Sequence, residues 1–408
     1  MRKRIFLCSA ILALLAAGCA QASDVKGSEN GQGIFEEVNN ALKTEGFNKE
    51  ESTEIPETPE ESKTSEGPLW TKGGADYTMD APLSQYGSGT TLTISSETTE
   101  DGADLSFMTL SKDGKELTAN RVIFVVNKDD KFVSVGFDRI DEIGFADCTL
   151  DGNDDVIIVG ETERGKEVAI CEWEKRYSEE YNDSFYSNDT LSESLEKMLG
   201  NDLSLSTVTK ALLGDSYTGS FASYKDAYKA AANLAKLKYG EEVKFGLVYF
   251  NDDDTPDLVV SLPGMVSLYL YENGSIHSPI YEWPYGAGGN AGYDMITKRA
   301  TVSNFDQDYA GMIYYESYMI MDENYEMQTA YYLEGYNFDD LNDNGIPDPE
   351  ETTDEAIEKA QGKIKYVDCT GANLSEAEVE KKMKELADFG TEWIGGEMSY
   401  EELLGKLN

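Results

Sequence analysis

One stretch of the chain carries oxygen-bearing side chains at the spacing of a metal-binding loop. From residue 340 the sequence reads DLNDNGIPDPEE, which satisfies the pattern D-x-[DN]-x-[DN]-G-x5-E at every position. Oxygen ligands that converge on one ion at 2.3–2.6 Å suit Ca²⁺, whereas Mg²⁺ needs a tighter octahedron. We therefore expect Ca²⁺ to be held by Asp340, Asn342, Asn344, Ile346 (through its carbonyl), Asp348 and Glu351.

Only three of these expected ligands are carboxylates, which is typical of extracellular sites with dissociation constants of roughly 10⁻⁴–10⁻³ M. The alternative is a solvated acidic turn that binds nothing specifically. The residues before the loop are strand-like and those after it are helical, so a regular helix–loop–helix is not expected.

Two other acidic loops share a frame, and this indicates an internal repeat. DCTLDGNDD begins at residue 147 and precedes the strand-like run VIIVG, and YFNDDDTPD begins at residue 249 and precedes LVVSL. Neither loop has a closing Glu, and the second has Tyr at position one and Asp at position six. The alternative is a β-turn whose Asp side chains cap backbone amides. The expected calcium ligands are Asp147, Thr149, Asp151 and Asp155 in the first loop, and Asn251, Asp253 and Asp257 in the second.

These three loops resemble known bacterial calcium motifs. The 340–351 loop is EF-hand-like and is similar to the DxNDNGIPD loops of bacterial surface proteins and thrombospondin type-3-like repeats. The other two resemble the loops of FG-GAP and VCBS repeats, which implies Ca²⁺ between β-strands. Residues 141–350 as a whole look like a group of uncharacterised lipoproteins of Gram-positive bacteria. That resemblance implies a cell-surface location and calcium, and no particular reaction.

The N-terminus has the composition of an export signal. Three basic residues precede an apolar run that is too short to span a bilayer comfortably. The run ends in LAAGC, which resembles the lipobox of bacterial lipoproteins. The resemblance implies a signal peptide over residues 1–18, cleavage before Cys19, and a lipid on Cys19 that anchors the chain outside the cytoplasm. Ordinary secretion with a chance Cys is the alternative.

The charge of the chain excludes some partners. The 408 residues include 78 acidic and 34 basic ones, which gives a formal charge of −44. Such a field repels nucleic acid and anionic lipid, so contact with the membrane is expected through the anchor only. Residues 19–67 are rich in Glu, Ser, Thr and Pro and are expected to form a disordered tether.

The elements that must position these loops are mainly β-strands. Short runs of alternating polarity separated by turns predict antiparallel sheets in a partial-propeller or sandwich arrangement, with a helical insert and a helical tail. The expected parts are a first β module over 68–185, a helical insert over 186–240, a second β module over 241–338, the calcium loop over 339–352 and a helical tail over 353–408.

One segment could recognise a glycan or a peptide. Aromatic side chains beside several glycines in residues 281–294 could form a stacking platform, or they could pack against the sheet. The candidate ligand-binding residues are Tyr281, Trp283, Tyr285, Asn290, Tyr293 and Asp294.

Catalytic signatures are missing from the sequence. The chain has one histidine, His277, and lacks the G-x-S-x-G, H-E-x-x-H and P-loop patterns. After Cys8 leaves with the signal, Cys148, Cys171 and Cys369 remain, and spacing does not decide whether the first two pair. The sequence therefore predicts a non-catalytic, calcium-binding surface protein with a scaffold or adhesion role, and a glycan- or peptide-recognition module is the alternative. A surface hydrolase is less favoured.

Overall fold

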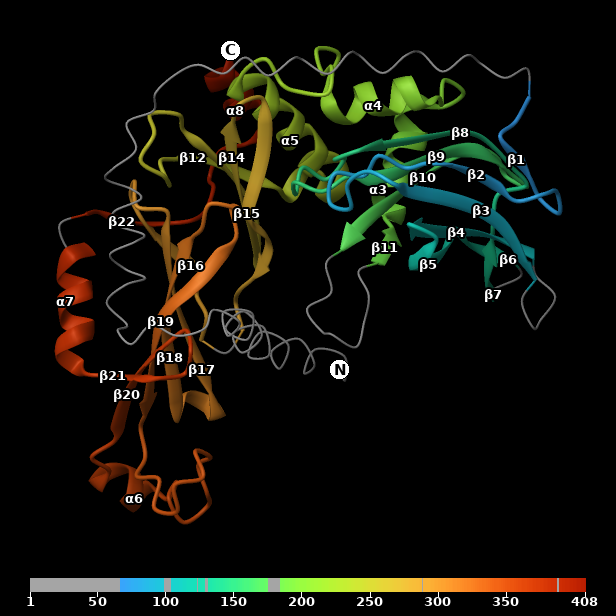
Figure 1. The fold of residues 1–408 in the computed structure, drawn as a ribbon. Helices are drawn as coiled ribbons and strands as arrows, with labels where there is room; N and C mark the ends of the chain where they lie inside the picture. Colours follow the sequence, from blue (N-terminus) through green and yellow to red (C-terminus); the bar gives the residue numbers. More distant parts are fainter. Residues whose placement is uncertain are drawn as a thin grey trace.

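The computed structural model describes residues 67–98, 104–122, 124–128, 131–174, 184–287, 289–386 and 389–408. The predicted signal peptide, Cys19 and all but the last residue of the predicted tether lie outside these ranges. The described chain consists mostly of antiparallel sheets with a few helices (Figure 1), which confirms the β-rich class. None of the described helices has the length and apolar composition needed to cross a bilayer.

The two predicted repeats form two similar sheets. The first sheet has the order β1-β8-β9-β10-β11 and the second has the order β12-β13-β14-β15. An acidic loop joins β8 to β9 and another joins β12 to β13. The strands of the first sheet are β1 (Trp70–Thr71), β8 (Arg139–Ala146), β9 (Asp155–Thr162), β10 (Gly165–Glu174) and β11 (Ser184–Ser187). Those of the second are β12 (Lys244–Val248), β13 (Asp257–Leu262), β14 (Met265–Glu272) and β15 (Ser275–Pro284).

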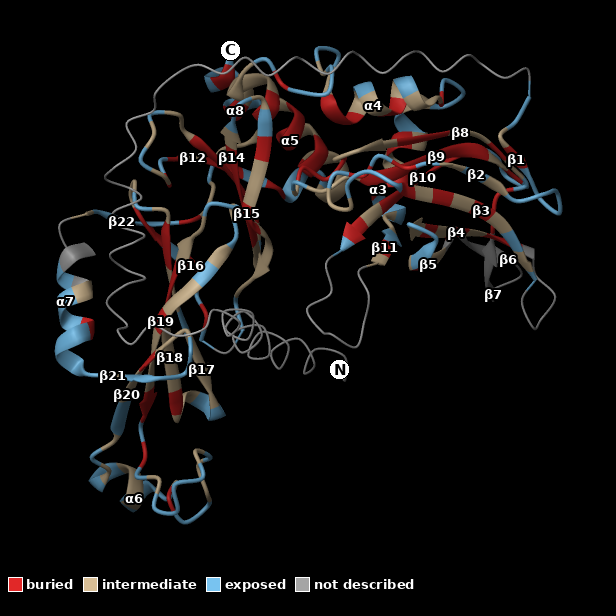
Figure 2. Cartoon of the chain, in the orientation of Figure 1, coloured by how far each residue is buried: buried red, intermediate tan, exposed pale blue. Residues whose placement is uncertain are grey.

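The central strand of each repeat is buried on both faces, which explains its continuous apolar sequence. In β9, Ile157 packs towards the helices and Ile158 packs towards a second sheet. In β13, Leu258 and Val259 face opposite sides in the same way. Figure 2 shows β9 as a largely buried strand, and β13 is buried along nearly its whole length.

An outer sheet covers the far face of each repeat. Against the first repeat lies the sheet β2 (Tyr77–Asp80), β3 (Thr90–Thr98), β4 (Asp104–Lys112) and β5 (Lys115–Val122), which forms a β-sandwich with it. A separate hairpin pairs β6 (Phe124–Lys128) with β7 (Lys131–Val135). The second repeat packs against a seven-stranded sheet of order β21-β20-β19-β18-β17-β16-β22. Its strands are β16 (Tyr293–Ile296), β17 (Thr301–Asp308), β18 (Ile313–Met321), β19 (Met327–Tyr336), β20 (Lys363–Asp368), β21 (Asn373–Leu374) and β22 (Thr391–Trp393).

Helices fill the space between the two repeats. The predicted insert contains α3 (Asp189–Leu199), α4 (Leu205–Leu213) and α5 (Tyr224–Tyr239), and α8 (Tyr400–Leu407) joins them. Ser204 and Ser223 accept hydrogen bonds from N3 amides and so fix where α4 and α5 begin. The apolar faces of these helices share one core with both repeat sheets, from Ile170 on one side to Phe245 on the other.

Two parts of the predicted architecture are wrong. The described strands do not form a partial propeller, because a helical layer separates the two repeats instead of the strands arranging around a common axis. The 353–408 segment is not a purely helical tail. It contains α6 (Asp354–Lys359) and α7 (Glu376–Leu386), but it also supplies β20, β21 and β22 to the seven-stranded sheet. The alternation of polar and apolar residues in KIKYVD is the strand signal that the prediction of a helical tail missed.

Candidate functional site

The 340–351 loop lies between β19 and α6, at the free end of the seven-stranded sheet (Figure 1). Three of its predicted ligands meet at one point. The Oδ2 atom of Asp348 accepts hydrogen bonds from Asn342 Nδ2 at 2.7 Å and from Asn344 Nδ2 at 3.1 Å. The predicted side chains are therefore brought together, and the donor set is rich in oxygen. Such a set fits a hard cation such as Ca²⁺.

The backbone of this loop is held by the same side chains. Asp340 accepts from the amides of loop positions five and six, Asn344 and Gly345, at 3.0 and 2.9 Å. Asn342 accepts from position five, and Asn344 accepts from position seven, Ile346. Position four, Asp343, and position six both have positive φ angles of 59° and 73°, and Gly345 accommodates the second without strain.

The 147–155 loop reproduces this framework. Asp147 accepts from the amides of positions five and six, Asp151 and Gly152, at 3.1 and 3.0 Å. Asp151 accepts from position seven, Asn153, at 2.9 Å. Positions four and six, Leu150 and Gly152, again have positive φ angles of 58° and 94°. A positive φ is uncommon for a buried Leu, so the loop conformation is imposed by the surrounding contacts.

The 249–257 loop keeps only part of the framework. Asn251 accepts from position five, Asp253, at 3.3 Å, and Asp253 accepts from position seven, Thr255, at 2.7 Å. Position one is Tyr249, which has no carboxylate, and position six is Asp254, whose side chain is fully exposed and pairs with Lys298 at 3.0 Å. The departures seen in the sequence thus coincide with the parts of the framework that this loop lacks.

A buried carboxylate closes each of the three loops by accepting a hydrogen bond from the amide of loop position two. Glu351 accepts from Leu341 at 2.7 Å, Asp155 from Cys148 at 2.9 Å and Asp257 from Phe250 at 2.8 Å. These three carboxylates are 5 %, 0 % and 1 % exposed. A buried amide without a partner is costly, so these bonds hold the two ends of each loop together.

In the 147–155 loop, the closing residue has other partners as well. Both oxygens of Asp155 accept from backbone amides, those of Thr149 and Trp173 among them, at 3.0 and 2.9 Å. The hydroxyl of Thr149 donates to the same carboxylate at 3.2 Å. Thr149 and Asp155 are therefore hydrogen-bonded to each other, and Asp155 is also hydrogen-bonded to the backbone.

Burial raises the pKa of several carboxylates in the 147–155 and 249–257 loops. Burial, and then repulsion from Asp151, hold the pKa of Asp147 well above its usual range, and burial raises the pKa of Asp155 in the same direction. Burial raises the pKa of Asp151 to about 6 and that of Asp257 to about 7. Several buried carboxyl groups close together form a site at which a bound cation is electrostatically favoured.

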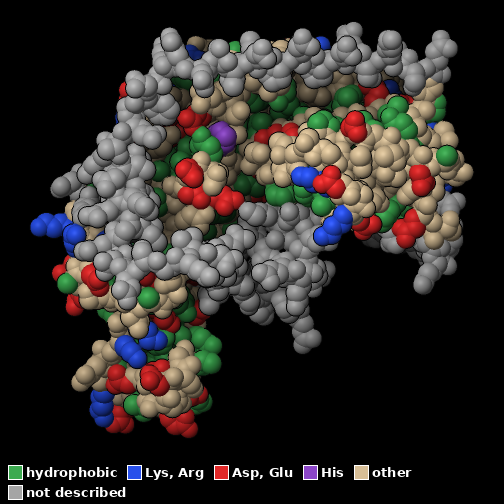
Figure 3. Space-filling model, viewed as in Figure 1, with side chains coloured by type: hydrophobic (Ala, Val, Ile, Leu, Met, Phe, Trp, Pro, Cys, Tyr) green, Lys and Arg blue, Asp and Glu red, His purple; other side chains and the backbone are tan. Residues whose placement is uncertain are grey.

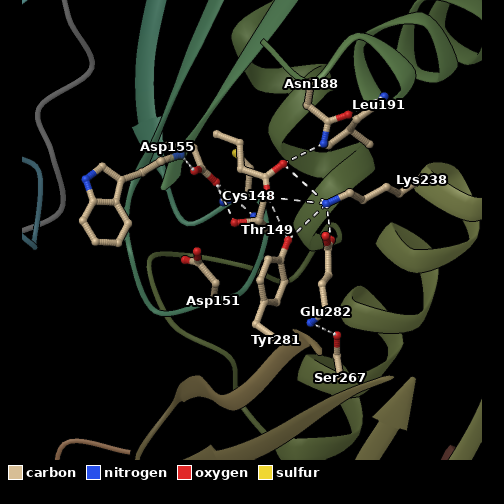
Figure 4. A network of polar contacts seen from close by, with 12 residues as sticks. Cys148, Thr149, Asp151, Asp155, Asn188, Leu191, Lys238, Ser267, Tyr281 and Glu282 are labelled. Atoms are coloured by element: carbon tan, nitrogen blue, oxygen red, sulfur yellow. Dashed lines mark hydrogen bonds and ion pairs between the residues drawn. The ribbon is translucent and has the colours of Figure 1, made fainter. Parts of the chain in front are cut away.

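A second polar cluster, which the sequence did not reveal, lies next to the 147–155 loop (Figure 4). Lys238 on α5 forms ion pairs with Glu172 of β10, at 3.4 Å, and with Glu282 of β15. The Tyr281 hydroxyl donates to Glu172 at 2.9 Å, and the Tyr239 hydroxyl donates to Glu282. The cluster joins both repeats to the helical layer. Its one signal in the sequence is a lysine at the end of an otherwise apolar helical face, ANLAKLKYG.

Glu282 adopts a strained conformation within this cluster. Its φ is +53°, and the pairing of β14 with β15 is irregular between Val266 and Leu268. Such an outlier persists where surrounding contacts fix it. Attraction to Glu172 and Glu282 outweighs the effect of burial and raises the pKa of Lys238 above its usual value, so the amine stays charged.

The 281–294 segment does not form an open aromatic platform. Tyr293 is 6 % exposed and donates to Pro284 O, and the Tyr285 hydroxyl donates to Leu262 O. The Trp283 ring packs 5.2 Å from that of Tyr293, within the core between the second repeat and the seven-stranded sheet. Asn290 is buried and accepts from Gly292 N. Of the predicted ligand-binding residues, Asp294 alone is exposed, because the aromatic rings fill the core instead.

The remaining reactive side chains have structural surroundings. Cys148 and Cys171 are free buried thiols that belong to different cores, on opposite faces of the first repeat sheet, and Cys369 is also free. His277 stacks on Tyr325 with ring centroids 3.6 Å apart, and burial lowers its pKa. The ring is visible on the face shown in Figure 3, among acidic side chains.

Comparisons with protein-family models, with curated proteins and with solved structures find no match to this chain.

We predict that Asp257→Asn lowers the free energy of unfolding by about 1–3 kcal/mol, because the backbone N–H of Phe250 loses its carboxylate acceptor. Asp252→Asn, at an exposed position of the same loop, makes the same change in charge and should cost less than about 0.5 kcal/mol. Urea unfolding followed by tryptophan fluorescence measures both. Equal losses in the two variants would contradict the role of Asp257.

Lys238→Met should lower the free energy of unfolding by about 3–5 kcal/mol, because it leaves Glu172 and Glu282 without their cation. The control is Lys197→Met on α3, whose ion pair with Glu193 is largely exposed and is worth at most about 1 kcal/mol. Urea denaturation compares the two variants. If they unfold at the same urea concentration, the cluster does not join the repeats.

Proposed function

We propose that this protein is a calcium-binding, lipid-anchored surface protein whose β modules serve a non-catalytic scaffold or binding role. The observation that carries the proposal is the convergence of Asn342, Asn344 and Asp348 in a loop closed by Glu351. The resemblance of this loop to bacterial calcium loops supports the same reading. The near-identical framework of the 147–155 loop supports a second site of the same kind.

Ca²⁺ would act in these loops as a structural ion. In the 340–351 loop it would be held by Asp340, Asn342, Asn344, Asp348, Glu351 and the carbonyl of Ile346. In the 147–155 loop it would be held by Asp147 and Asp151, with Asp155 and Thr149 beside them. When bound, the ion supplies positive charge that offsets the repulsion between carboxylates. The side chains themselves order the loop backbone, because they accept hydrogen bonds from its amides.

The third loop, at residues 249–257, is the weakest candidate for Ca²⁺. It retains Asn251, Asp253 and Asp257, but it lacks a carboxylate at position one and a glycine at position six. Lys298 also places a positive charge 3.0 Å from Asp254. We propose that this loop keeps its shape through the Asp257 hydrogen bond and binds Ca²⁺ more weakly than the other two.

Addition of 10 mM Ca²⁺ should stabilise the protein by about 2.7 kcal/mol if the site binds with a dissociation constant of roughly 10⁻⁴ M. For a chain of this size, this corresponds to a rise of about 3–4 °C in the melting temperature. Glu351→Gln should abolish the part of this rise that comes from the 340–351 loop. Differential scanning fluorimetry with and without EDTA measures it.

The matched control is Glu350→Gln, which removes one negative charge at the exposed neighbouring position. It should leave the effect of Ca²⁺ unchanged, because Glu350 is outside the ligand pattern. Isothermal titration calorimetry should give two sites for the unmodified chain and one for Glu351→Gln. A melting temperature that changes with neither Ca²⁺ nor EDTA would refute the proposal.

The location has its own test. Cys19→Ser should abolish incorporation of a clickable fatty-acid analogue and move the chain from the membrane fraction to the culture medium, because the lipid is the proposed anchor. Cys369→Ser should change neither result. An unmodified chain that carries no fatty acid would contradict the anchor and leave the calcium proposal intact.

A further inference from the structure

A groove of about 1060 Å³ lies at the free end of the seven-stranded sheet, next to the 340–351 loop. One side is the sheet face formed by β18, β19 and β20, and the other includes α6 and the residues that follow it. The residues that line it include Tyr314, Gln361, Ile364, Tyr366 and Asn373. The groove belongs to none of the loops and polar clusters described above.

The sheet side of the groove carries the ring of Tyr314, and an exposed phenylalanine ring stacks beside it. Tyr314 pairs with Gly335 across β18 and β19, and a Cβ atom at 335 would overlap the Tyr314 ring. The glycine therefore lets the ring lie across the sheet. Phe305 on β17 is 42 % exposed, and its ring stacks against that of Tyr314 with centroids 6.1 Å apart and planes 27° apart. Ile364 extends this apolar surface and is 51 % exposed.

The charged groups around the groove leave little attraction for an anion. Lys363 pairs with Asp343 at 3.4 Å, and Lys365 pairs with Glu334 at 3.9 Å and with the Tyr336 hydroxyl at 3.0 Å. Glu376 also lines the groove, and the chain carries a net charge of −44. A polyanion would be repelled by this field. The polar groups that remain for a ligand include the side-chain amides of Gln361 and Asn373.

We propose that this groove binds a neutral polysaccharide. Sugar rings stack through their C–H faces on flat aromatic rings such as Tyr314 and Phe305, and amides such as those of Gln361 and Asn373 hydrogen-bond to hydroxyl groups. An extended peptide fits less well, because its specificity needs separate pockets for alternate side chains, whereas Tyr314 and Phe305 offer two stacked rings.

The calcium loop fixes one wall of the groove. The backbone amide of Gln361 donates to Asp339 at 3.0 Å, and Lys363 pairs with Asp343, so residues of the loop region hold the segment that follows α6. In this respect the inference rests on the proposed calcium function. Ca²⁺ in the 340–351 loop should stabilise the wall and strengthen polysaccharide binding.

Affinity electrophoresis of the full-length chain in native gels tests the inference. The gels contain hydroxyethylcellulose, arabinoxylan, galactomannan or a soluble β-glucan, with polygalacturonate as the anionic polymer and carboxymethylated casein as the peptide. We expect at least one neutral polymer to retard the chain. Tyr314→Ala should weaken that binding about threefold to tenfold, as expected for the loss of one stacked ring.

Two further variants distinguish the loss of a stacked ring from misfolding. Gly335→Ala keeps Tyr314 but displaces its ring, and it should weaken binding as Tyr314→Ala does. Tyr186→Ala removes an exposed tyrosine from β11, far from the groove in the sequence, and should leave binding unchanged. Circular dichroism and melting temperatures establish that each variant is folded. The inference is overturned if no neutral polymer retards the chain, if only polygalacturonate or casein does, or if both groove variants bind normally.

The dependence on calcium separates this inference from the function on which it rests. EDTA and Glu351→Gln should each weaken retardation, and Glu350→Gln should not. If EDTA does not change the retardation, the groove is not coupled to the calcium loop. If calorimetry detects Ca²⁺ binding but no polymer retards the chain, the groove inference alone fails. If calorimetry detects no Ca²⁺, the proposed function fails, whatever the gels show.

Discussion

A single kind of hydrogen bond organises all three acidic loops. A carboxylate at the end of each loop accepts from the amide of the second loop residue, and in each case that carboxylate is almost completely buried. In the two repeats this carboxylate belongs to the first residue of the central strand. The bond therefore fixes both the shape of the loop and the place where that strand begins.

Burying carboxylates has an electrostatic cost, and different parts of the molecule offset it to different extents. At the cluster between the repeats, Lys238 supplies the positive charge that Glu172 and Glu282 need. In the 147–155 loop, burial raises the pKa of three aspartates, and repulsion from neighbouring carboxylates adds to the effect. The loop is thus held in a conformation that favours a cation, and the strained φ of Leu150 is part of that conformation. The 340–351 loop is more exposed to solvent, apart from its closing residue Glu351.

The sequence predicted the local features of this protein better than its assembly. The β-rich class and the helices between residues 186 and 240 followed from periodicity and capping residues, and the frame shared by the acidic loops is matched by shared hydrogen bonds. The helical layer between the repeats could not be predicted, because strand patterns do not specify which sheets share a core. For the same reason the sequence could not show that Tyr293 faces a core or that Tyr314 lies across a glycine of the next strand.

The position of α8 has a consequence for the order of assembly. Leu403 and Leu407 lie in the same core as strands from both repeats, and Met398 pairs with Phe245 of β12. Ribosomal synthesis proceeds from the N-terminus, so α8 emerges long after the strands that it covers. The central layer therefore stays open to solvent until residue 407 has been delivered, and during that interval a chaperone or a protease could reach a core that the finished molecule conceals.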